Sequence, residues 1–122
     1  MESPVNATRQ DQAVVAKQDG ERLVLSLLAR EFDICHAPKI IPAFQTGYHA
    51  GIRQVEFNLE QVKLIDCASM NAMQHCLRRI NPDIPVTIIH RHRLLTVDLY
   101  TPYLKLIHPE LSVTQLQEVN SN

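Results

Sequence analysis

Residues that could take part in chemistry gather in the short stretch LIDCASMNAM, which runs from residue 64 to residue 73. Here Asp66 is followed directly by Cys67, Ala68 and Ser69, and a helical pattern begins. An aspartate in front of a helix can accept a hydrogen bond from a first-turn backbone N–H and so act as an N-cap. Small side chains behind it would leave the other free N–H groups of the helix start accessible to a second macromolecule. We therefore keep two interpretations of Asp66 open: a helix cap alone, or a cap that also belongs to a docking surface.

Two further groups could suggest catalysis or metal binding. Cys67 at a helix start could act as a nucleophile, but nothing in the sequence places a histidine beside it as a base. His90 and His92 could bind a metal from one side of a strand, but a third ligand is not evident and the neighbouring arginines would repel a cation. The three glycines are not clustered into a phosphate-binding loop. We therefore expect no metal site, no cofactor and no enzyme.

Length and composition favour one small domain. The chain has 122 residues, 45% of them apolar, and a formal net charge of -1, so no overall field attracts nucleic acid or an anionic membrane. No segment has the apolar length of a membrane span, and the polar beginning of the chain does not resemble a secretory signal. The three cysteines (35, 67 and 76) lack zinc-type spacing, which indicates free thiols in a reducing cytoplasm. We expect a flexible N-terminal segment over residues 1–12 and a domain over residues 13–119.

The first half of the chain predicts a hairpin, a helix and a strand. Strands are expected over residues 13–17 and 22–28, joined at the Asp19–Gly20 turn. A helix should follow, with Pro38 in its first turn, while Pro42 indicates either a later helix start or a bend. The alternating residues 54–59 then predict the next strand.

The second half continues the alternation of helix and strand. A helix is expected from Ser69, with Met70, Met73, Leu77 and Ile80 on one stripe that faces the core. The alternative is that Met70 is partly exposed and contributes to a contact surface. Residues 85–90 are apolar enough for a strand buried on both faces. A helix over residues 93–100 should be interrupted at Thr101–Pro102, and a last helix is expected after Ser112. This order predicts a mixed sheet with a parallel portion and right-handed crossovers.

Three segments together, REFDICHAPKI, VEFNLEQVKLIDCASMNAM and PVTIIH, resemble the STAS domain, the family of sulphate transporters and anti-sigma-factor antagonists. The Glu31–Phe32–Asp33 loop and the turn beginning Ile65–Asp66 carry the resemblance, which covers roughly residues 13–116. It implies a single α/β domain with a mixed sheet of four to five strands and helices packed mainly on one face. It also implies that the Asp33 loop lies beside the Asp66 turn.

The chain departs from this family at its switch residue. In switching members, the second residue after the aspartate is a serine or threonine that a partner kinase phosphorylates, whereas this chain has Ala68 there. The usual glycine is replaced by Ser69, which becomes the candidate phosphorylation site. The resemblance implies a partner-binding set made of Asp33, Ile34, Asp66, Cys67, Ala68, Ser69 and Met70.

Two functions follow from the resemblance. The first is a cytoplasmic protein-interaction module that binds a kinase-type anti-sigma factor, or a related regulator, in a partner-switching pathway. The alternative is an accessory subunit that docks on the ATPase of a lipid-trafficking ABC transporter. Neither involves nucleic acid or insertion into a membrane, and the sequence predicts no oligomeric state.

Overall fold

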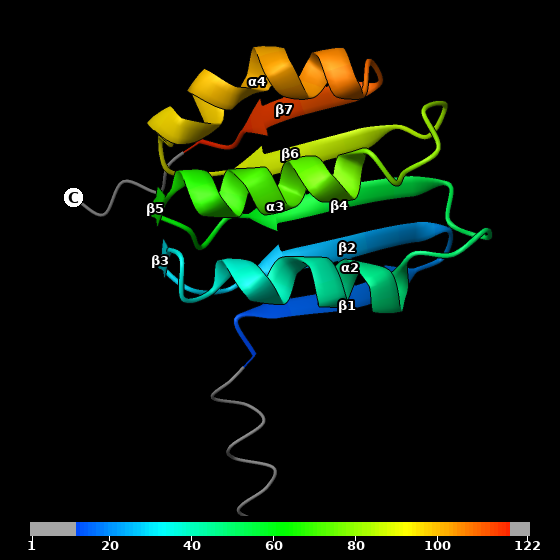
Figure 1. The fold of residues 1–122 in the computed structure, drawn as a ribbon, viewed down its shortest axis with the longest axis horizontal. Helices are drawn as coiled ribbons and strands as arrows, with labels where there is room; N and C mark the ends of the chain where they lie inside the picture. Colours follow the sequence, from blue (N-terminus) through cyan, green and yellow to red (C-terminus); the bar gives the residue numbers. More distant parts are fainter. Residues whose placement is uncertain (1–11, 118–122) are drawn as a thin grey trace, which may run out of the picture.

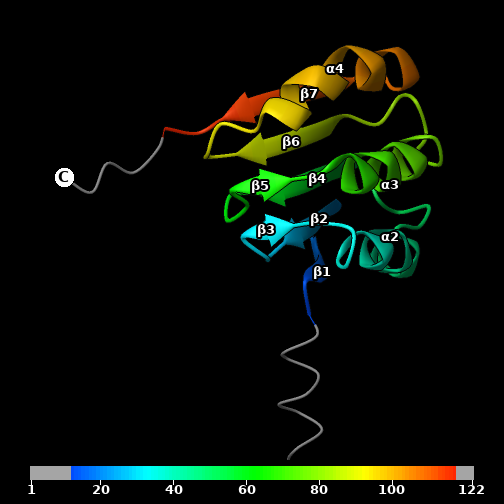
Figure 2. The ribbon, with the colours of Figure 1, turned by 60° about the vertical axis from the view of Figure 1, so that its left-hand side comes forward.

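The computed structural model describes residues 12–117, so the segment predicted to be flexible lies outside the described residues except for Gln12, as do positions 118 and 119 of the predicted domain. A five-stranded sheet in the order β1-β2-β4-β6-β7 carries the helices on one face (Figures 1 and 2). This confirms the predicted α/β domain with a mixed sheet. The elements are β1 (Val14–Asp19), β2 (Arg22–Leu27), β3 (Glu31–Phe32), η1 (Ala37–Lys39), α2 (Ile40–Gly47), β4 (Gln54–Leu59), β5 (Leu64–Ile65), α3 (Cys67–Leu77), β6 (Val86–His90), α4 (Leu95–Ile107) and β7 (Leu111–Gln115).

The sheet combines one antiparallel pair with a parallel portion, as predicted. β1 and β2 are antiparallel, and Gly20 in the turn between them has a φ of 63°, a conformation that costs glycine little. β2, β4, β6 and β7 run parallel to one another and are joined through the helices. Because parallel neighbours need a crossover, each helix packs back over the sheet it leaves.

One core lies between the sheet and the helices. On β2, Leu23, Leu25 and Leu27 alternate inward and are almost fully buried, as the spacing of two requires. The helices approach the sheet closely: a Cβ added at Gly47, the last residue of α2, would lie 2.7 Å from Leu23 Cδ1. A side chain at position 47 would therefore require the Leu23 side chain to shift.

The other face of the sheet is not covered by a helix, and this corrects one expectation. Thr87 and Ile89 of β6 are half-buried rather than buried, because their side chains point to this uncovered face. The same face holds Glu56, which is only 7% exposed and forms an ion pair with Arg22 at 3.1 Å. Paired polar side chains such as these, and not a second layer of helices, therefore cover part of this face of the sheet.

Three helix predictions were wrong in their details. α3 begins at Cys67, two residues earlier than predicted, because Asp66 is the N-cap. α4 runs through Pro102 to Ile107. Pro102 is exposed, and because a proline has no backbone N–H, one carbonyl of the preceding turn lacks its helical hydrogen bond. The helix predicted after Ser112 is instead β7, because its backbone pairs with β6. The structure also answers the question left open at Pro42. Pro42 is the third residue of α2 and lies in the first turn, where a backbone N–H has no helical acceptor in any case.

Candidate functional site

A second, two-stranded sheet builds the corner at which the candidate residues meet. β3 pairs in parallel with β5, and the Asp66 N–H extends the pairing by donating to the Phe32 carbonyl at 3.2 Å. Figure 2 shows this small sheet in front of the ends of β2 and β4. It brings the loop that starts at Asp33 next to the start of α3. Sequence reasoning missed this sheet, because strands of two residues are too short to show an alternating pattern.

Asp66 caps α3. Its Oδ1 accepts a hydrogen bond from the Ser69 backbone N–H at 3.0 Å and one from the Ser69 hydroxyl at 2.9 Å. The capping interpretation of Asp66 is therefore confirmed. Asp66 is half-buried, and its Oδ1 is already occupied within the turn.

Two of the predicted contact residues are not accessible. Ser69 and Met70 are each 0% exposed. The Ser69 hydroxyl lies within hydrogen-bond distance of the Phe32 carbonyl (3.3 Å) as well as Asp66, and Met70 is part of the core cluster. The alternative of a partly exposed Met70 is wrong, because its helical position faces the sheet. In this conformation neither side chain can contact a partner, and the Ser69 hydroxyl is not presented to a kinase.

The other predicted residues surround an accessible corner. Cys67 and Ile34 are exposed, while Asp33 and Ala68 are half-exposed. Ile34 is 68% exposed. The corner therefore joins apolar surface to the small residues at the start of α3.

Two exposed leucines enlarge this apolar surface and were not predicted. Leu64 on β5 and Leu95 at the start of α4 are each 63% exposed. They line a cleft of about 260 Å³, together with Lys63, Ile65, Arg93, Leu94 and Thr96. In sequence, Leu64 and Ile65 look like one buried apolar pair. Only the pairing of β5 with β3 turns Ile65 inward and Leu64 outward.

We call this surface the docking corner and define it by Asp33, Ile34, Leu64, Asp66, Cys67, Ala68 and Leu95. Charged side chains of both signs border it. Lys63 and Arg93 line its cleft, and Glu31 and Asp33 line a neighbouring hollow with Leu64.

The Asp33 loop is held by its own hydrogen bonds. Asp33 Oδ1 accepts from the Cys35 N–H at 2.9 Å and lies 3.1 Å from His36 Nδ1. The Phe32 and His36 rings pack with their centroids 5.3 Å apart. These contacts form an Asx-type turn, which fixes the backbone that presents Ile34.

Cys67 faces a phenol. Its side chain hydrogen-bonds the Tyr100 hydroxyl of α4, and Tyr100 in turn donates to Asn71 Oδ1 at 3.1 Å. Partial burial, and secondarily the Cys67 side chain, raise the pKa of Tyr100 above its ordinary value of 10.0. Neither Tyr100 nor Asn71 is a histidine or a carboxylate of the kind that activates a thiol nucleophile.

Among residues 12–117, no group of three or more His, Cys, Asp or Glu side chains is arranged to hold a metal ion. His90 is 2% exposed, and its Nδ1 is 2.9 Å from the His92 carbonyl, so the ring is engaged inside the fold. None of the helices in the described part of the chain has the length and apolar character needed to cross a bilayer.

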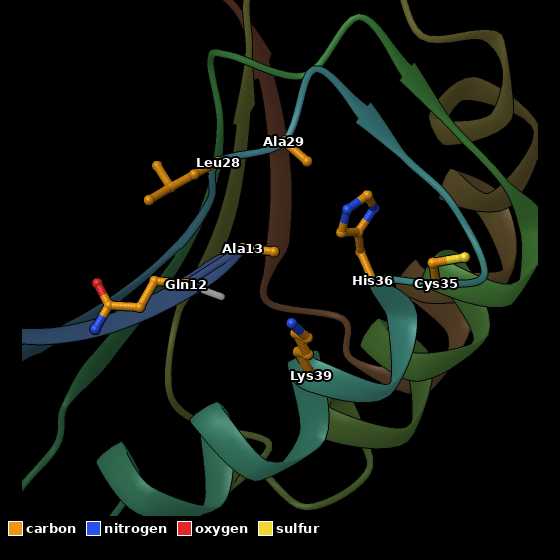
Figure 3. A pocket seen from close by; sticks show the side chains of 7 residues that line it. All are labelled: Gln12, Ala13, Leu28, Ala29, Cys35, His36 and Lys39. Atoms are coloured by element: carbon orange, nitrogen blue, oxygen red, sulfur yellow. The ribbon is translucent and has the colours of Figure 1, made fainter. Parts of the chain in front are cut away.

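A further hollow lies beside the docking corner. It has a volume of about 440 Å³ between η1 and the ends of β1 and β2. Figure 3 shows His36 and Lys39 extending from the helical segment toward Ala13 and Ala29 across this space. Gln12, the first described residue, forms part of its wall, so the hollow adjoins chain that is not described.

The comparisons with known proteins support the fold. No protein-family model matches the chain, and no curated protein matches it. Among solved structures, it is similar to an anti-sigma factor antagonist from Mycobacterium paratuberculosis, with a TM-score of 0.65, 13% identity, and coverage of 81% of this chain and 83% of that one. A structure named Mglu matches 64% of this chain with a TM-score of 0.54 and 26% identity, but the match spans only 20% of that protein.

These comparisons define the class of fold: the chain has a STAS-like fold, as the sequence resemblance predicted. At 13% identity the likeness concerns the fold alone.

Proposed function

We propose that the protein is a non-enzymatic, cytoplasmic interaction module that binds another protein through the docking corner. The favoured partner is a kinase-type anti-sigma factor, or a related regulator, in a partner-switching pathway. The observation that carries the proposal is the exposure of Ile34 and Leu64 beside the uncluttered start of α3. Contiguous apolar surface bordered by charged side chains is typical of a protein-binding surface.

The chemistry of the corner supports this kind of partner. Ile34 and Leu64 can enter an apolar patch of the partner, while an apolar partner side chain can fill the cleft between Leu64 and Leu95. The mixed charges at the border, Lys63 and Arg93 on one side and Glu31 and Asp33 on the other, would set orientation and specificity more than affinity. Binding at this corner needs no rearrangement of the core.

Ala68 determines how such a module would be regulated. It lies in the first turn of α3 and cannot accept a phosphate, while the neighbouring Ser69 hydroxyl is buried. Control by phosphorylation at this turn would require local opening of the helix start. We therefore propose a form that remains competent for binding while the domain is folded.

The test uses the full chain as bait for capture from the host's own lysate. Four further baits are run in parallel: Ile34→Asp, Leu64→Asp and Ala68→Asp in the docking corner, and Ala50→Asp in the exposed loop between α2 and β4 as a matched control. We expect one protein to be retained by the unmodified chain and by Ala50→Asp and to be lost from the other three. A carboxylate inside a desolvated interface should weaken binding by at least about tenfold.

The identity of the selectively lost protein decides between the functions. A histidine-kinase-like ATPase supports partner switching, whereas the ATPase of a lipid-trafficking ABC transporter supports the accessory-subunit alternative. If every captured protein binds all five baits equally, the docking corner is not the interface and the proposal is wrong. Circular dichroism of each bait verifies that the substitutions leave the fold intact.

A further inference from the structure

The outer face of α4 carries a row of apolar side chains that nothing within residues 12–117 covers. Leu95, Leu99, Tyr103 and Leu106 are 63%, 71%, 63% and 81% exposed. Their spacing of four, four and three residues places them on one stripe of the helix. The opposite stripe, with Val97 and Leu104, is already buried in the core. α4 therefore has two apolar faces, although a helix that lies at the surface of a single domain needs one.

The position of α4 makes this stripe accessible. α4 is the last helix of the helical layer and lies over the edge strand β7 in Figure 1. Within residues 12–117, α3 is the helix that packs most closely against it. A second macromolecule can therefore approach the whole length of the stripe.

The stripe is complementary to itself when two copies of α4 run antiparallel. In that arrangement Leu95 of one copy lies opposite Leu106 of the other, and Leu99 lies opposite Tyr103, because both pairs are centred near residue 101. An interface between identical surfaces related by a two-fold axis is the commonest way in which proteins form dimers.

The charged side chains on one flank of the stripe favour an antiparallel over a parallel arrangement of the two α4 helices. Asp98 and Lys105 are two helical turns apart on the same flank, and both are exposed. Asp98 has only a long contact of 4.0 Å with Arg93, and Lys105 has no ion pair among the described residues. In an antiparallel pair the same flank of each helix meets, so Asp98 of each copy faces Lys105 of the other. In a parallel pair related by a two-fold axis, opposite flanks meet, so Asp98 and Lys105 of one copy would not face those of the other and no such ion pairs would form.

The same flank argues against a lipid surface as the occupant. A helix that lies on an anionic membrane carries an excess of Lys and Arg beside its apolar stripe. On α4 one acid and one base balance each other.

We propose that the stripe formed by Leu95, Leu99, Tyr103 and Leu106 is the interface of an antiparallel homodimer of this chain, closed by two Asp98–Lys105 ion pairs across the two-fold axis. The stripe shares Leu95 with the docking corner, but Leu99, Tyr103 and Leu106 lie outside that corner, so the dimer can be tested separately from the function proposed above.

The test measures the mass of the full chain by sedimentation as a function of concentration. The unmodified chain should reach the dimer mass, and Leu106→Glu should remain monomeric, because it places a carboxylate in the interface. Asp98→Lys and Lys105→Asp should each weaken the dimer by about tenfold, since each replaces two attractions by two repulsions. An equimolar mixture of Asp98→Lys and Lys105→Asp should associate as tightly as the unmodified chain, because both ion pairs form again between the two variants.

Three results would overturn the proposal. They are a monomer at all concentrations up to the millimolar range, a dimer that Leu106→Glu leaves intact, and single charge variants that associate as well as the unmodified chain or are not restored by mixing. The far-ultraviolet circular dichroism of Leu106→Glu identifies a variant that has failed to fold. In that case Leu99→Ser, a smaller change in the middle of the stripe, replaces it in the same measurement. Capture with the Ile34→Asp bait is unaffected by any of these outcomes, so failure of the dimer and failure of the docking corner are distinguishable.

Discussion

Single residues at the start of α3 determine what the docking corner can do. Asp66 Oδ1 accepts hydrogen bonds from the Ser69 N–H and hydroxyl, and these bonds make the helix start rigid. Cys67 is exposed, and Ala68 beside it is half-exposed. Ala68 has no hydroxyl and the Ser69 hydroxyl is buried, so neither residue presents a group for phosphorylation at this turn.

The N-cap gives the first prediction at this scale. Asp66→Ala should lower the free energy of unfolding by about 1–2 kcal/mol, because it removes the acceptor for the Ser69 N–H. Asp66→Asn should lose much less, since an amide oxygen can still cap the helix. Chemical denaturation of both variants measures the difference. Equal losses in the two variants would show that the carboxylate charge, and not the cap, carries the stabilisation.

Cys76 gives a prediction about pH. Burial in the core raises the pKa of this thiol to about 12 from the ordinary value of 9.0, and Arg79 offsets only part of the effect. The native state therefore holds a proton that the unfolded state has lost between these two values, so stability falls as pH rises from about 9 toward 12. Over that window the unmodified chain should lose up to about 1.4 kcal/mol per pH unit more than Cys76→Ala does.

The measurement is denaturant unfolding at several alkaline pH values. Cys35→Ala, which removes an exposed thiol, serves as the control and should follow the unmodified chain. Parallel curves for the unmodified chain and Cys76→Ala would contradict the prediction.

At the scale of elements, neighbours in space override local preference. The two residues of β3 and the two of β5 are strands only because they pair with each other, and that pairing places Asp33 beside Asp66. β7 reads as a helix in sequence, yet it is a strand because β6 offers a free parallel edge. α4 continues through Pro102 because Val97 and Leu104, before and after it, are both anchored in the core.

Pro102 can be tested directly. Pro102→Ala should raise the free energy of unfolding, by up to about 3 kcal/mol, because it adds a helical N–H donor and a better helix former. Thermal and chemical unfolding measure the gain. Pro109→Ala, which changes a proline in the turn after α4, should give no gain. A loss of stability in Pro102→Ala would mean that the proline serves α4 through a contact or through the unfolded chain.

At the scale of the whole molecule, the domain is one layer of helices on one side of one sheet (Figure 2). A single core joins the two, and the uncovered face is closed by side-chain pairs such as Arg22 with Glu56. The two surfaces proposed above for partners, the docking corner and the outer stripe of α4, share Leu95. If both bind partners, binding at one will influence binding at the other.

A substitution at Met73 tests how tightly α3 and the sheet pack in the shared core. It is 0% exposed in the middle of α3, so Met73→Ala should cost about 2–5 kcal/mol of unfolding free energy. Gln74→Ala, one residue further along the same helix and half-exposed, should cost far less. A loss below about 1 kcal/mol for Met73→Ala would show that the space between α3 and the sheet can collapse around the smaller side chain.

The sequence by itself determined the elements that rest on local signals. The Asp19–Gly20 turn, the alternation in β2 and β4, the methionine spacing of α3 and the cap at Asp66 all depend on residues a few positions apart, and the structure has each of them. The resemblance to the STAS domain, carried by several such signals in order, predicted the fold correctly.

Only the tertiary structure decided which side chains are accessible. Leu64 and Ile65 are equally apolar, as are Leu95 and Leu104, but one of each pair is exposed and the other buried. Ser69 and Met70 were expected at the surface and lie within the fold. Exposure depends on what packs over a residue from a distant part of the chain, and a local pattern carries no information about that distant partner.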